Sequence, residues 1–173
     1  MEVLKLLCFL TSLAVVSNAL HRTVTLSSGY ITKGRNASDI TIQNHRGSQE
    51  IIWEKDFNNL KFYFMKVHEV TGTLEAVTVD NVCKKYKKES IERAVNDFFL
   101  KELAKTDKCP IKKGKVKISY PMNFKYEIND PKTACGPIIA MYNIIRKNQT
   151  NSDDNPLLMN IWYQGVISGD GCK

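Results

Sequence analysis

The sequence predicts a mainly β protein, a two-sheet antiparallel sandwich with one amphipathic helix. Most of the chain has apolar residues at every second position, which is typical of strands. Gly, Asn, Ser and Pro separate these short segments, as in folds built from hairpins. The last two apolar segments, 137–146 and 157–167, are apolar on both faces, which indicates that both of their faces are covered.

The N-terminus has the features of a secretory signal peptide. The start MEVLK is followed by the apolar run LLCFLTSLAVV and then by the small residues of Ser17-Asn18-Ala19. The apolar run is shorter than the roughly 20 residues that a membrane span needs. We therefore expect residues 1–19 to be a signal peptide and residues 20–173 to form one secreted, extracellular domain.

The first half of this domain predicts five strands. Segments 24–31, 39–44 and 50–54 alternate and are separated by turn residues. Segments 60–70 and 74–80 form a hairpin around Thr71-Gly72, and we expect His68 to be exposed near the end of its first strand. One face of that strand carries Leu60, Phe62 and Phe64, and the other carries Tyr63, Met65 and Val67.

Only Ser90 to Ala104 has helical periodicity. Its apolar residues recur every three or four positions, which places them on one face of a helix that Ser90 can cap. We expect this helix to cover the open side of a sheet, with Phe98 and Phe99 largely buried. The apolar face consists of Ile91, Ala94, Val95, Phe98, Phe99 and Leu103.

The C-terminal region predicts one or two strands interrupted at Pro121, followed by a closing hairpin. If that hairpin is centred between Asp153 and Asp154, Cys135 lies opposite Cys172, close enough for a disulfide. The chain beyond the signal peptide has four cysteines, and an even number in a secreted chain implies paired bridges. Pairing Cys135 with Cys172 leaves Cys83 and Cys109 to form the second disulfide.

We find no sequence pattern for catalysis. The chain has three histidines, and no G-x-S-x-G elbow, H-E-x-x-H motif or Gly-rich phosphate loop. The adjacent Asp153 and Asp154 lie in a polar loop, where solvated turn residues are the expected interpretation. We therefore expect a protein that is not an enzyme, with no catalytic residues, no bound metal and no cofactor.

Charge and glycosylation motifs point to the surface. The formal net charge is +7, with lysines concentrated in 84–88 and 112–117. These clusters fit either a solvated face or attraction to an anionic headgroup or membrane surface. Nucleic acid is not an expected partner, because the secreted chain has no binding motif. The sequons at Asn36 and Asn148 predict glycosylation on surface loops.

The order of these features resembles a known family. CPIKKG at 109–114 resembles the C-P-hydrophobic-K-x-G element of GM2-activator-like and MD-2-related lipid-recognition proteins. The strand GPIIAMYNII and a final strand ending in G-V-I follow in the family's order, so the likeness covers about Val79 to Ile167. The layout is closest to insect chemosensory proteins of the CheB type. The resemblance implies an immunoglobulin-like β-cup and a Cys83–Cys109 bridge that closes the helix-bearing segment.

The resemblance also implies a function. It favours a secreted carrier of a lipid or hydrophobic signal molecule, held in an apolar cavity between two sheets, with chemosensory detection as one role. A membrane receptor or membrane surface is a further expected partner. The rival interpretations are an interaction protein with a solid core and a basic binding surface, and a protein that presents lipid to a hydrolase. The expected cavity residues are Phe62, Phe64, Ile139, Met141 and Trp162.

Overall fold

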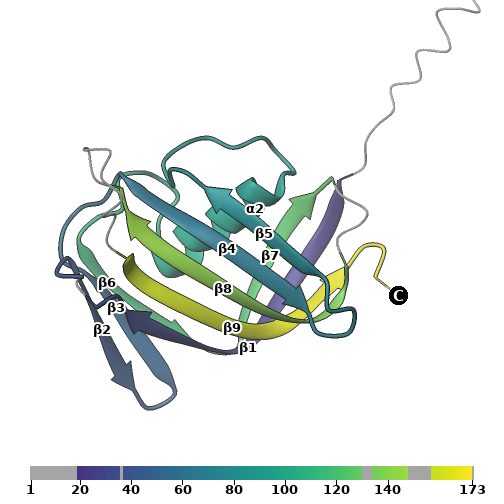
Figure 1. Ribbon diagram of the computed structural model, residues 1–173, viewed down its shortest axis with the longest axis horizontal. Helices are drawn as coiled ribbons and strands as arrows, with labels where there is room; N and C mark the ends of the chain where they lie inside the picture. The colour runs from purple at the N-terminus through teal and green to yellow at the C-terminus, as the bar shows by residue number, and fades with distance from the viewer. Residues whose placement is uncertain (1–18, 36, 130–133, 148–156, 173) are drawn as a thin grey trace, which may run out of the picture.

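The structure is a computed structural model that describes residues 19–35, 37–129, 134–147 and 157–172. Residues 1–18 of the expected signal peptide (residues 1–19) and both sequon asparagines, Asn36 and Asn148, lie outside the described residues, so the structure does not test these predictions. Two antiparallel sheets and one short helical segment make up the described fold, so the predicted fold class is confirmed (Figure 1).

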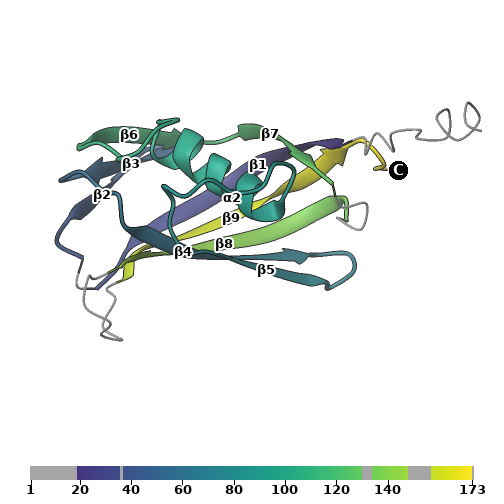
Figure 2. The ribbon, with the colours of Figure 1, turned by 90° about the horizontal axis from the view of Figure 1, so that it is seen from above.

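The larger sheet has six strands in the order β5-β4-β8-β9-β1-β7, and the smaller has the order β2-β3-β6. The large sheet curls so that its edge strands β5 and β7 approach each other across the helix, which contacts both (Figures 1 and 2). The large-sheet strands are β1 (Leu20–Lys33), β4 (Leu60–His68), β5 (Leu74–Val79), β7 (Met122–Ile128), β8 (Gly136–Arg146) and β9 (Leu157–Gly169). The small-sheet strands are β2 (Ile40–His45), β3 (Ser48–Trp53) and β6 (Gly114–Ser119).

The predicted helix is present in two parts. An α-helix, α2 (Ile91–Phe98), continues into a π-helical segment, η1 (Phe99–Leu103). The side chain of Ser90 caps α2 by accepting a hydrogen bond from the Arg93 amide at 3.2 Å. Phe98 and Phe99 are 5% and 0% exposed, which confirms that the apolar stripe faces the core.

Pro121 marks the point where the chain changes sheets. Strand β6 ends at Ser119 in the small sheet, and β7 begins at Met122 in the large one. Proline has no backbone N–H to donate, so a continuous ladder cannot pass through this position. The predicted interruption therefore separates two strands of different sheets.

Both predicted disulfides are present. Cys83 and Cys109 are joined with a Cα–Cα distance of 5.6 Å, and Cys135 and Cys172 with one of 5.5 Å. The guanidinium of buried Arg22 donates to both sulfur atoms of the second bridge.

The register of the closing hairpin differs from the expected one. Gly136 lies opposite Ile167, so Cys135 is not directly across from Cys172. The bridge forms because the chain turns back after β9, where the Cys172 amide donates to the Gly169 carbonyl at 3.1 Å. Gly169 has a φ of +121°, and a Cβ there would meet the His21 carbonyl oxygen at 2.3 Å, so the turn requires glycine.

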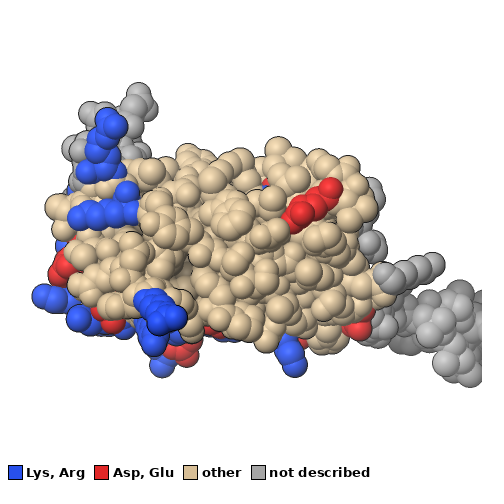
Figure 3. Space-filling view, turned by 90° about the horizontal axis from the view of Figure 1, so that it is seen from below, with Lys and Arg blue, Asp and Glu red and all other residues tan. Residues whose placement is uncertain are grey.

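The outer, convex face of the large sheet is apolar. Figure 3 looks onto this face and shows that Lys, Arg, Asp and Glu lie mainly around its edge. The prediction that both faces of the last two strands are covered is therefore correct for the inner face and wrong for the outer face. Several large apolar side chains of this face are exposed, namely Tyr30, Tyr63, Val67, Leu74, Trp162 and Val166.

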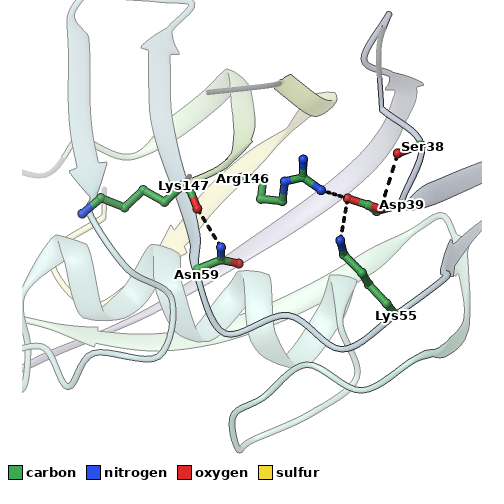
Figure 4. A network of polar contacts seen from close by, with 6 residues as sticks. All are labelled: Ser38, Asp39, Lys55, Asn59, Arg146 and Lys147. Atoms are coloured by element: carbon green, nitrogen blue, oxygen red, sulfur yellow. Dashed lines mark hydrogen bonds and ion pairs between the residues drawn. The ribbon is translucent and has the colours of Figure 1, made fainter. Parts of the chain in front are cut away.

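A polar network joins the small sheet to the end of β8 (Figure 4). Asp39, just before β2, accepts from Arg146 at the end of β8 and forms an ion pair with Lys55 at 3.0 Å. Burial alone would raise the pKa of Asp39, but the hydrogen bond from Lys55 and the charges of Arg146 and Lys55 together lower it. The carboxylate is therefore the form that holds the two sheets together at neutral pH.

Candidate functional site

A cavity lies inside the curl of the large sheet, under α2. Every described residue that lines it comes from α2 or from strands β1, β4, β7, β8 and β9 of the large sheet. The cavity therefore lies between one sheet and the helix, whereas the sequence analysis expected it between two sheets. Its lining residues are Val24, Leu26, Phe64, Lys66, Ile91, Ala94, Val95, Phe98, Phe124, Tyr126, Ile138, Ala140, Tyr142, Tyr163 and Ile167.

Of the expected cavity residues, Phe64 lines the cavity. Phe62 faces inward on the same strand but lies deeper in the core, with its ring 5.4 Å from that of Phe99. Ile139, Met141 and Trp162 are on the outer face of the sheet, so their assignment to the cavity was wrong.

The physical reason is that β8 and β9 are apolar on both faces. Alternation shows which residues share a face, but not which face turns inward. The inward residues of β8 are Ile138, Ala140, Tyr142 and Ile144.

The cavity is small in this conformation. Its volume is about 60 Å³, several times the roughly 10–15 Å³ that one water molecule requires. That space accommodates a polar group with a few carbon atoms. A longer ligand requires side chains or α2 to shift.

A polar row crosses the floor of the cavity. Glu75 of β5 lies opposite Lys66 of β4, Lys66 lies opposite Ala140 of β8, and Ala140 lies opposite Tyr163 of β9. Lys66 is 3% exposed and is the one charged side chain among the described residues that line the cavity. Its ammonium group is 3.0 Å from a carboxylate oxygen of Glu75, which balances the buried charge.

Sequence reasoning missed Lys66, although a signal was available. Strict alternation along β4 places Lys66 on the same face as Phe62 and Phe64, which were expected to face inward. His68 follows on that face and is 1% exposed, so the expectation that it is exposed was wrong. Its Nε2 lies 3.1 Å from the other carboxylate oxygen of Glu75.

Three tyrosines also line the cavity. Burial raises the pKa of Tyr142 and Tyr163 well above its ordinary value and that of Tyr126 to about 12, so all three remain protonated at neutral pH. The Tyr142 hydroxyl donates to the Val95 carbonyl at 3.5 Å. The Tyr163 hydroxyl is buried, and no described residue hydrogen-bonds to it.

A polar groove of about 370 Å³ adjoins the cavity between α2 and β7. Ala94, Phe124 and Tyr126 border both spaces, so this groove lies beside the cavity. Its remaining lining is mostly charged, with Arg93 of α2 paired to Asp97 at 2.8 Å. An apolar chamber next to a charged groove suits a molecule with an apolar chain.

No protein-family model, curated protein or solved structure matches this chain. Among the described residues, no helix is long and apolar enough to cross a membrane. The same residues contain no group of three or more His, Cys, Asp or Glu side chains placed to hold a metal ion. The two disulfides are compatible with an oxidising compartment.

Proposed function

We propose that this protein is a secreted carrier of a lipid or other long-chain hydrophobic molecule, bound in the cavity under α2 and not chemically altered. The observation that supports this proposal is the cavity lining, which is apolar apart from Lys66 and the tyrosine hydroxyls. The signal-peptide pattern and the likeness of CPIKKG to lipid-recognition proteins support it from the sequence. Chemosensory detection is the role that we propose for the carrier.

The energetics of such binding are favourable. Each buried methylene gains about 0.8 kcal/mol, so a chain of about twelve carbons gains roughly 10 kcal/mol gross. Association and ordering costs then leave an affinity on the order of micromolar. Because the cavity now holds only a few carbons, part of this gain is spent on moving α2 or the aromatic side chains beneath it.

A matched pair of substitutions on β8 tests the proposal. Ile138 lines the cavity, and its neighbour Ile139 lies on the outer face. Ile138→Phe should reduce binding of a fluorescent fatty-acid probe, whereas Ile139→Phe should leave it unchanged. Circular dichroism and thermal unfolding confirm that both variants fold.

The wild-type protein provides the decisive measurement. Saturable probe binding, or lipid found by mass spectrometry after extraction of the purified protein, is the expected result. If neither is found, the cavity does not serve a ligand and the carrier proposal fails.

A second candidate is a secreted interaction protein with a filled core. The apolar outer face of the large sheet supports it, with Trp162 38% and Val166 47% exposed. The partner would be a protein with a complementary apolar surface. Trp162→Ser should then abolish binding of that partner, and the wild-type protein should show no saturable binding of the probe.

A further inference from the structure

The polar groove between α2 and β7 meets the cavity at three residues. Ala94 of α2 and the β7 residues Phe124 and Tyr126 line both spaces. Ala94 contributes only a methyl group to this boundary, so its side chain fills little of it. Because these three side chains line both spaces, this boundary is where a chain that fills the cavity reaches the groove.

The ammonium group of Lys101 lies at this boundary. Its Nζ atom is 6.0 Å from the centre of the Phe124 ring, and Lys101 itself lines the groove. The carboxylates of Asp97 and Glu102, which are the closest to it along the helical segment, pair with other cations. No described carboxylate forms an ion pair with Lys101, so its ammonium group keeps its N–H donors for a ligand.

The groove as a whole favours an anion. The described residues that line it include four cations and three carboxylates, and the lysine-rich segment 84–88 adjoins it through Lys88. An excess of positive charge along a concave surface raises the local concentration of anions. The cations are Lys88, Arg93, Lys101 and Lys125, all exposed, and the carboxylates are Glu89, Asp97 and Glu127.

The cavity itself offers no comparable charge. Lys66 is the one charged side chain among the described residues that line it, and its ammonium group is 3.0 Å from a carboxylate oxygen of Glu75. A second carboxylate placed there would share one cation with Glu75 and would lose its water, which is costly. An acidic head group is therefore expected in the groove, where it keeps its hydration.

We propose that the carried molecule is an anionic amphiphile, whose acidic head group lies in the groove beside Lys101 and whose apolar chain runs past Phe124 into the cavity. A long-chain carboxylate is the simplest member of this class, and long-chain sulfate or phosphate esters share its chemistry. This inference rests on the proposed carrier function and specifies its ligand. The groove volume of about 370 Å³ accommodates a hydrated head group, whereas the cavity of about 60 Å³ has a mostly apolar lining.

Four compounds test this assignment on residues 20–173 at neutral pH, by displacement of N-phenyl-1-naphthylamine, an uncharged fluorescent probe. They are laurate, dodecanol, dodecylammonium and acetate. The first three share a chain of twelve carbons, and acetate has the head group alone. Laurate should bind about fivefold more tightly than dodecanol, as expected for one exposed ion pair, and dodecylammonium more weakly than either. Acetate should not displace the probe at concentrations where laurate does.

Each other outcome overturns a defined part of the proposal. Equal affinity for laurate and dodecanol, or tightest binding of dodecylammonium, would overturn the anionic head group and leave the carrier function standing. Displacement by acetate at the concentration of laurate would overturn the division of one ligand between groove and cavity. The absence of saturable binding for the probe and for every long-chain compound would overturn both proposals.

Lys101→Gln locates the head group. It should remove most of the preference for laurate over dodecanol and leave the affinity for dodecanol unchanged, whereas Lys101→Arg should retain the preference. Lys117→Gln is the matched control, because it removes the same charge from an exposed lysine of β6 that does not line the groove. Circular dichroism checks the folding of all three variants. An unchanged preference in Lys101→Gln, or an equal loss in Lys117→Gln, would overturn the placement of the head group beside Lys101.

Discussion

Phe98→Ala removes the side chain that connects the helix to the cavity. Phe98 is 5% exposed and lines the cavity from α2. Its ring stacks on Tyr142 at 5.7 Å and meets the rings of Phe124 and Tyr163 edge-on at 5.4 Å and 5.6 Å. The substitution therefore breaks three aromatic contacts and joins new empty space to an existing cavity.

The expected loss of unfolding free energy is about 3–5 kcal/mol, which is the range for replacing a buried large aromatic side chain with alanine and leaving a cavity behind. The transfer of the ring from water accounts for roughly 1.5–3 kcal/mol of this, and the lost ring contacts and empty space for the rest. Because one side of the ring already faces the cavity of about 60 Å³, the ring has fewer contacts to lose than a fully packed one, which argues for the lower half of the range.

Phe99→Ala is the matched control. Phe99 is fully buried and packs against Trp53 and Phe62, and it does not line the cavity. Both variants should lose similar stability in urea unfolding. Ligand should stabilise Phe99→Ala as much as the wild type, by about 2.7 kcal/mol when the free ligand is at roughly 100 times its Kd. It should stabilise Phe98→Ala by a different amount at the same concentration, because only that substitution changes the cavity lining.

Two results would refute this reasoning. A loss below about 1 kcal/mol for Phe98→Ala would place the ring on a pliable surface instead of in the core. Equal stabilisation of the wild type and both variants by ligand would show that the bound molecule does not contact Phe98 beneath α2.

Three other predictions concern stability. Replacing Cys83 and Cys109 by serine should cost about 3.5 kcal/mol in urea unfolding, because the bridge spans 26 residues, and non-reducing peptide maps that link either cysteine elsewhere would contradict the pairing. Asp39→Asn should cost about 1–2 kcal/mol at neutral pH. Burial by itself would raise the pKa of Asp39, but its two cationic partners together hold that pKa below its ordinary value. The stability that the Asp39 carboxylate contributes is therefore present above about pH 4 and is lost as the pH falls through the lowered pKa. The unfolding free energies of wild type and Asp39→Asn should therefore converge in acid, and parallel pH profiles would contradict the assignment. Ser90→Ala should cost about 1 kcal/mol in thermal unfolding, since it removes the cap on the Arg93 amide, and an unchanged Tm would show that the cap contributes nothing.

The sequence by itself determined the elements of this fold. Strand alternation predicted the hairpin of β4 and β5, and the spacing from Ile91 to Leu103 predicted a helix with Phe98 and Phe99 inside. These predictions succeed because backbone geometry fixes which side chains share a face. Pro121 predicted the interruption for a similarly local reason, the missing N–H donor.

The tertiary structure decided which faces turn inward and where the cavity lies. Ile138 and Ile139 are both apolar, and only the curl of the sheet around α2 places the first inside and the second outside. The structure also places Lys66 of β4 opposite Ala140 and Ala140 opposite Tyr163, although β4 lies far in the sequence from the hairpin of β8 and β9. Periodicity describes one strand at a time, whereas this row depends on the register between strands, which long-range packing fixes.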